Sequence, residues 1–111
     1  MYVLPNVNLR HPVRVLVANV GEKPVVPAFR VFRTNGREVR NQQYQLSPAA
    51  GPIPPNGTWL TTLTFLDVGA GSEPIDGQVQ ISCDDDASMA VQYEYDQVIR
   101  TTIRLNAVRV P

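Results

Sequence analysis

The stretch WLTTLTFL, residues 59–66, decides the fold class of this chain. Its side chains fall into two alternating sets: Trp59, Thr61, Leu63 and Phe65 against Leu60, Thr62, Thr64 and Leu66. Successive side chains of a β-strand point to opposite faces, so this two-residue period predicts a strand. The preceding Pro54-Pro55-Asn56-Gly57 is a turn signal that separates this strand from the one before it.

Short apolar runs between turn signals recur along the rest of the chain. Further strands are expected over 13–20, 27–33, 37–46, 78–83, 87–95 and 99–110. Asn35-Gly36 predicts a tight hairpin that returns the chain from one strand to the next. No segment carries a helical period. The sequence therefore predicts an all-β protein, a single antiparallel β-sandwich of seven or eight strands that is jelly-roll-like.

The length of the chain predicts one domain over residues 1–111. Residues 1–10 are expected to form an extended N-terminal arm or an edge strand. The start of the sequence lacks the basic and apolar regions of a signal peptide. No run approaches the roughly 20 apolar residues that a membrane-spanning helix needs. We therefore expect a cytoplasmic protein, free or incorporated in an assembly, with no membrane insertion.

Charge is balanced over the chain but divided between its halves. Residues 1–60 carry seven basic and two acidic side chains, whereas residues 61–111 carry three basic and eight acidic ones. Opposed charges of this kind can pair head to tail between copies of a chain. The alternative is that strands from both halves interleave in the fold and their charges mix.

Residues able to carry out catalysis are scarce. Cys83 is the only cysteine and His11 the only histidine, so no internal disulfide, multi-cysteine zinc site or recognisable catalytic triad is available. Cys83 is expected to be a small buried side chain. No phosphate-binding glycine loop precedes a helix. The sequence predicts a protein that is not an enzyme and needs no cofactor.

Two clusters of charged residues are candidates for ligand binding. Asp84-Asp85-Asp86 offers carboxylate oxygens of the kind that Ca²⁺ prefers, although adjacent aspartates also form solvated turns. Arg30, Arg33, Arg37 and Arg40 flank the expected hairpin. Because the isoelectric point is about 6.5, well below that of a dedicated nucleic-acid binder, we expect these arginines to be solvated rather than to bind nucleic acid.

A series of turn and strand motifs covers residues 13–96. The motifs are Val17-Ala18-Asn19-Val20-Gly21, Pro24, Phe29-Arg30-Val31-Phe32, Asn35-Gly36, Pro55-Asn56-Gly57-Thr58-Trp59, Gly77–Cys83 and Met89-Ala90-Val91-Gln92. Their order resembles that in soluble sensory rhodopsin transducer proteins and other small bacterial β-sandwich modules. This chain lacks a matching aromatic-rich N-terminal segment and ends differently. The resemblance implies a cytoplasmic, oligomeric β-sandwich that binds partners without performing chemistry.

The function expected from these features is that of a self-associating structural or assembly subunit. Either end of the chain can add a strand to the open edge of a neighbouring copy, closing a ring or extending a filament. The residues expected to take part are Tyr2, Val3, Leu4, Arg10, Arg104 and Arg109. The alternative is a ligand- or protein-binding adaptor of the sensory transducer kind, which uses a cleft between the sheets or the loops at one end.

Overall fold

The computed structural model describes residues 1–66, 74–96, 102–106 and 108–109. The elements in these ranges are β1 (Tyr2–Asn8), β2 (Val13–Asn19), β3 (Ala28–Arg33), β4 (Glu38–Val39), the 3₁₀ turn η1 (Asn41–Gln43), β5 (Tyr44–Ser47), β6 (Thr58–Phe65), β7 (Asp76–Ser82), the 3₁₀ turn η2 (Asp86–Ser88), β8 (Met89–Asp96), β9 (Thr102–Asn106) and β10 (Val108–Arg109). All pairings between these strands are antiparallel. The all-β prediction is confirmed.

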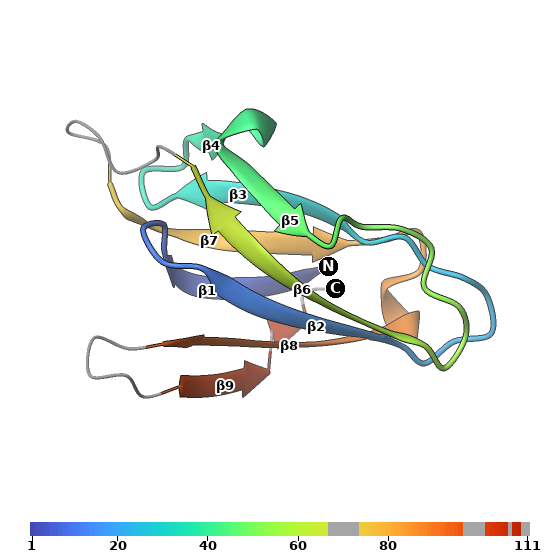
Figure 1. Cartoon of the computed structure of the whole chain (residues 1–111). Coiled ribbons are helices and arrows are strands. Elements are labelled where there is room, and N and C mark those ends of the chain that lie inside the picture. The colour runs from blue at the N-terminus through green and yellow to red at the C-terminus, as the bar shows by residue number, and fades with distance from the viewer. Residues whose placement is uncertain (67–73, 97–101, 107, 110–111) are drawn as a thin grey trace.

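The strands form two sheets. Sheet A has the order β10-β1-β7-β3-β4, and sheet B has the order β5-β6-β2-β8-β9. Figure 1 shows them as two layers, with β6 crossing in front of β7. Some strands that follow one another in the chain, such as β1 and β2 or β6 and β7, lie in opposite sheets, whereas β3 and β4, β5 and β6, and β8 and β9 are neighbours in one sheet. Each sheet therefore contains strands from both halves of the sequence.

The segment 37–46, expected as one strand, occurs as β4 in sheet A, then η1, then β5 in sheet B. The hairpin at Asn35-Gly36 is confirmed, because β3 and β4 pair on either side of it and Gly36 has a φ of 85°. The chain then leaves sheet A after two residues and crosses to the other layer. The two-residue alternation is interrupted here, since Val39 and Tyr44 have opposite parity and four polar residues, 40–43, lie between them. The expectation of one strand over 37–46 was therefore wrong.

A single hydrophobic cluster lies between the sheets. In β6, Leu63 and Thr61 are buried while Leu60 is 58% exposed, so the two alternating sets lie on opposite faces, as the strand prediction requires. The cluster is built from Leu4, Val7, Leu9, Val13, Val15, Val17, Val25, Val31, Val39, Ile53, Leu63, Val79, Ile81, Met89, Val91 and Tyr93. Phe29 of β3 packs edge to face on Trp59 of β6, with ring centroids 5.8 Å apart. Side chains of both sheets thus share one core, in a sandwich-like arrangement.

Among the described residues, no helix is long and apolar enough to span a membrane.

One end of the fold is held by the buried side chain of Asn19, which is 1% exposed. Its amide nitrogen donates to the carbonyl oxygens of Lys23 (2.7 Å) and Ile53 (2.9 Å). Its amide oxygen accepts from the backbone N–H of Gly21 at 2.9 Å. Its own backbone pairs with residues 56 and 57. One residue therefore joins the loop after β2 to the loop before β6, and every polar group that it brings into the interior is hydrogen-bonded.

Replacing Asn19 with alanine should destabilise the protein by about 3 kcal/mol, because two carbonyls and one N–H lose their partner inside the fold. Urea unfolding followed by tryptophan fluorescence measures this change. Asn6→Ala is the matched control, since Asn6 is exposed and should alter stability by no more than about 0.5 kcal/mol. Equal effects of the two substitutions would contradict the role given to Asn19.

Gly77 lies where β7 passes very close to β3. A Cβ added at this residue would lie 2.1 Å from the carbonyl oxygen of Phe32, which is backbone and cannot turn away. Gly51, in contrast, lies in a loop with nothing within 4 Å of such an added Cβ. Because glycine has no Cβ, residue 77 allows β7 and β3 to pair at this distance.

Gly77→Ala should cost about 1–3 kcal/mol of stability through this forced displacement. Gly51→Ala should be neutral or should stabilise by up to about 1 kcal/mol, because alanine restricts only the unfolded chain there. Thermal unfolding of both variants beside the parent protein tests the pair. A Gly77→Ala variant as stable as Gly51→Ala would show that the close approach is not required.

Candidate interaction surfaces

The N-terminal segment is part of the sheet rather than a separate arm. β1 lies between β7 and β10, with Tyr2 paired to Arg109 and Val3 to Val108. Leu4 is fully buried, and the Tyr2 hydroxyl donates to the carbonyl of Met89 in the opposite sheet. The structure thus brings together Tyr2, Val3, Leu4 and the backbone of Arg109. Tyr2 and Leu4 are occupied in holding this chain's own two sheets together.

The other two residues expected to act in self-association lie elsewhere. Arg10 is exposed in the turn after β1, where its backbone N–H donates to the Asn8 side chain at 2.9 Å. Arg104 lies in sheet B, at the position of β9 that pairs with Glu94 of β8. Glu94 itself forms an ion pair of 2.6 Å with Arg14 of β2. The structure therefore places Arg104 at the end of a row of charged positions across sheet B.

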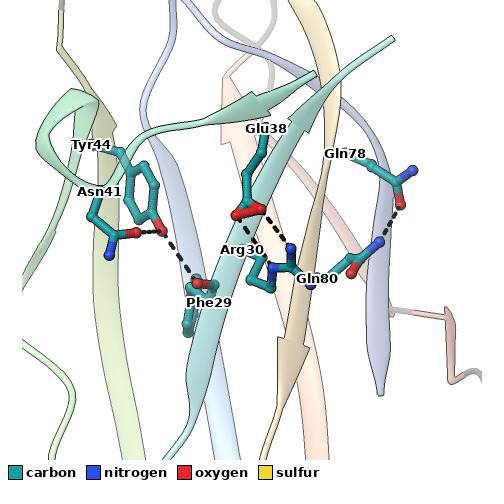
Figure 2. Close-up of polar contacts among 7 residues, drawn as sticks. All are labelled: Phe29, Arg30, Glu38, Asn41, Tyr44, Gln78 and Gln80. Atoms are coloured by element: carbon teal, nitrogen blue, oxygen red, sulfur yellow. Dashed lines mark hydrogen bonds and ion pairs between the residues drawn. The ribbon is translucent and has the colours of Figure 1, made fainter. Parts of the chain in front are cut away.

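The β4 side of the fold has a closed edge. β4 is only two residues long, and the strand behind it, β3, continues past it at Phe29. The Tyr44 hydroxyl of β5 lies 3.2 Å from the carbonyl oxygen of Phe29 and 2.9 Å from the side-chain oxygen of Asn41 (Figure 2). Burial raises the pKa of Tyr44 above its ordinary value, and the nearby Glu38 carboxylate adds to this effect. This phenol covers a carbonyl that a further strand would need.

The opposite side has two different edges. In sheet A, β10 covers β1 only at Tyr2 and Val3, and β1 then contains Pro5 and an irregular register between Leu4 and Val7. Proline and bulges both discourage the addition of a strand. In sheet B, all five residues of β9 pair with β8 in regular register, from Thr102 opposite Asp96 to Asn106 opposite Gln92. β9 contains no proline and no glycine, and among the described edge strands it has the longest regular pairing, since β5 at the other edge of sheet B pairs over four residues.

The outer face of sheet A is held by its own polar contacts. Arg30 pairs with Glu38, with Nη2 and Oε1 2.5 Å apart, and its guanidinium carbon lies 5.0 Å from the ring centre of Phe32. Beside them the Gln80 amide donates to the Gln78 side chain at 3.4 Å, as Figure 2 shows. The ion pair lowers the pKa of Glu38 and raises that of Arg30.

The arginines considered for nucleic-acid binding have different surroundings. Arg30 is engaged with Glu38, and Arg33 is 8% exposed and donates to the carbonyl of Pro74 at 2.7 Å. Burial of Arg33 was not foreseen from the sequence, because a charged residue at the end of a strand was expected to be solvated, although Arg33 has the same parity as Phe29 and Val31. The Arg33 side chain points inward, as does that of Val31 two residues earlier. Its guanidinium group reaches the carbonyl of Pro74 at the end of sheet A.

Asp84 and Asp85 are exposed in the turn before η2. The Asp85 carboxylate accepts a hydrogen bond of 2.7 Å from the Ser88 hydroxyl, and the Asp85 carbonyl accepts one of 3.0 Å from the Ser88 N–H. The side chain of Asp86 lies outside the described residues. Within the described part of the chain, no group of three His, Cys, Asp or Glu side chains is placed to hold a metal ion. Cys83, just before this turn, is partly buried and packs on the core.

The outer face of sheet B carries no charged residue along β5 and β6. Two of the large exposed apolar side chains, Leu60 and Leu66, belong to β6 and the residue that follows it. Leu16 of β2 pairs with Leu60, and beside them a depression of about 130 Å³ opens between β6, β2 and β8. Ligand pockets for small molecules measure roughly 300–1,000 Å³, so this depression suits a single side chain rather than a small-molecule substrate.

Comparison of the chain with protein-family models, with curated protein sequences and with solved structures finds no match.

Arg30→Gln should raise the pKa of Glu38 toward its ordinary value, because the guanidinium that favours the carboxylate is removed. A titration of the Glu38 side-chain carboxyl by NMR measures the shift. Since folding lowers this pKa, the ion pair stabilises the fold above the unfolded-state pKa of Glu38, and that contribution is lost as pH falls through the folded-state value. Phe32→Leu, which leaves both charges in place, should keep the pKa of Glu38 low. Equal pKa values in the parent and Arg30→Gln proteins would contradict this assignment.

Proposed function

We propose that the chain is a non-catalytic, self-associating structural or assembly subunit, whose copies join through the regular edge of sheet B formed by β9. The fold we propose for it is a jelly-roll-like β-sandwich of one domain. Support for the sandwich comes from the single core that both sheets share and from a chain that crosses repeatedly between the two sheets. The subunit needs no cofactor, and its expected location is the cytoplasm.

The observation that carries the proposal is the contrast between the sheet edges. Tyr44 covers the edge beyond Phe29, and Pro5 with a bulge interrupts the edge of β1. β9 has neither device and presents five regularly paired residues in the described structure. An unprotected edge of this kind binds an added strand through main-chain hydrogen bonds.

The most suitable strand to add is β9 of a second copy. Its sequence, TIRLN, places Ile103 and Leu105 at one parity and the polar residues at the other. When two such strands pair antiparallel about a twofold axis, each residue meets one of the same parity. Sheet B then continues across the interface with its core face and outer face in line. A strand of another protein would need the same alternation to fit as well.

A second function is supported by the loops at the end held by Asn19, at the right of Figure 1. Val20 is 63% exposed and Val26 is 54% exposed in the loop that joins β2 to β3. Loops fixed on a rigid scaffold are frequent binding sites. This is the adaptor of the sensory transducer kind. It predicts a monomer in the absence of its partner, whereas the leading proposal predicts an oligomer.

Disulfide trapping tests the proposal without removing β1, whose deletion would take a strand out of sheet A. In a Cys83→Ser background, single cysteines are placed in turn at residues 102–106 of β9 and, as a matched control on the other edge of sheet B, at Gln45 of β5. Paired β9 strands should give a reducible dimer at the residue nearest the twofold axis and little elsewhere, since directly opposed residues lie about 4.5–5.5 Å apart. Gln45→Cys should remain uncrosslinked.

Light scattering over a range of protein and salt concentrations gives the second readout. A mass above the 12.3 kDa of the single chain, rising with concentration, agrees with the proposal. A mass of 12.3 kDa at every concentration, without crosslinking in β9, would exclude self-association and favour the adaptor.

A further inference from the structure

The outer face of sheet B carries a projecting side chain next to a recess. Leu60 is 58% exposed and pairs with Leu16 of β2 on one side, whereas on its other side β5 pairs with β6 only from Thr62 to Phe65. The recess of about 130 Å³ beside it is lined by Arg14, Leu16, Leu60, Gln92, Tyr93 and Glu94. A cavity of ~150 Å³ takes up a benzene molecule, so this recess has room for one leucine side chain. Leucine is also the side chain that the same face projects.

The charge of this region is unusual for the chain. Residues 41–66, which include β5 and β6, contain no Asp, Glu, Lys or Arg. At the chain average of 18% charged residues, a stretch of this length would hold about five. The cores of protein interfaces are depleted in charged residues. The nearest charged side chains on the face, Arg14 and Glu94, are paired with each other at 2.6 Å.

We infer that this face, centred on Leu60 and Leu16, is a second self-association surface, on which two copies pack face to face about a twofold axis and each Leu60 enters the recess of the other copy. The inference rests on the proposed self-association of the chain and adds a contact distinct from the β9 edge. Its occupant is a second copy of this chain.

Self-complementarity is the reason for this choice of occupant. A twofold interface brings the same patch of both copies together, so a charge near the axis would meet its like. The uncharged strand β6 avoids that repulsion, and the Arg14–Glu94 pair that lines part of the recess is neutral overall. The shape of the face also favours a second copy as the occupant, because the projecting Leu60 lies next to a recess that has room for one leucine side chain.

Two different twofold contacts on one subunit have a consequence for assembly. The β9 edge alone yields a dimer, because each copy has one such edge. With the face contact added, every copy can join two neighbours, and the copies form a closed tetramer or a continuing chain. The face contact is small, so its effect is expected at high protein concentration.

The test uses opposite charges at residue 60. Leu60→Glu and Leu60→Lys should each lower the association constant of the face contact by about tenfold or more, because like charges then meet near the axis and lose water there. An equimolar mixture of the two variants should regain association. Val26→Glu is the matched control, since Val26 is a similarly exposed aliphatic residue on another surface. Thermal unfolding checks that the three variants are folded like the parent protein.

The mass from light scattering reports both contacts together, and disulfide trapping reports each contact separately. In the Cys83→Ser background, Leu60→Cys should crosslink while Val26→Cys should not. Crosslinking in β9 should persist in the Leu60→Glu protein.

If Leu60→Glu keeps the parent mass and Leu60→Cys does not crosslink, while β9 still does, the face inference is wrong and the proposed function stands. If neither contact crosslinks and the parent stays at 12.3 kDa, both are wrong. Crosslinking at Leu60 alone would support the face contact and overturn the role of β9.

Discussion

The burial of Asn19 is the constraint on which the rest of the structure depends. Its backbone and side chain hydrogen-bond to three segments: the turn at Gly21–Lys23, the loop at Ile53 and the turn at residues 56–57. Next to it, the N–H of Val20 donates to the carbonyl of Ser88 at 2.7 Å, where β8 begins. These bonds fix where β2 ends relative to the starts of β6 and β8. Those three strands form the centre of sheet B, so the hydrogen bonds at the Asn19 end of the fold set the register of the sheet.

Both lateral sides of the fold are closed by a chain segment that passes from one sheet to the other, and the two closures differ. On one side β4, η1 and β5 follow one another, and Tyr44 reaches across to the backbone of β3. On the other side β9 and β10 are separated by one residue. There the edge in sheet A is short and irregular, but the edge in sheet B is long and regular. Closure therefore shields the edge of sheet A on the first side, whereas β5 and β9 both remain regularly paired edges of sheet B.

The local features of this fold were predictable from the sequence, and the features that join distant segments were not. The alternation in residues 59–66 predicted the strand and its division into two faces, and Asn35-Gly36 predicted the hairpin, because each depends only on neighbouring residues. The role of Asn19 has no such signal, since its partners at Ile53 and Gly57 are brought to it by the whole fold. The crossing between β4 and β5 falls where polar residues 40–43 interrupt the alternation, but nothing local shows that the chain changes sheet there.

The candidate sites differ in the same way: those predicted from the sequence depend on local patterns, and those that the structure adds depend on which strands lie side by side. Charge counted by halves of the chain favoured head-to-tail pairing, but each sheet mixes strands of both halves, and Arg14 pairs with Glu94 inside one subunit. Charge counted along residues 41–66 is more informative, because it shows that the part of the outer face of sheet B formed by β5 and β6 carries no charged residue. Main-chain pairing at β9 accepts any strand of suitable parity and so gives affinity with little selectivity. A leucine beside a recess of its own size accepts far fewer partners, so the selectivity of assembly is better assigned to the face than to the edge.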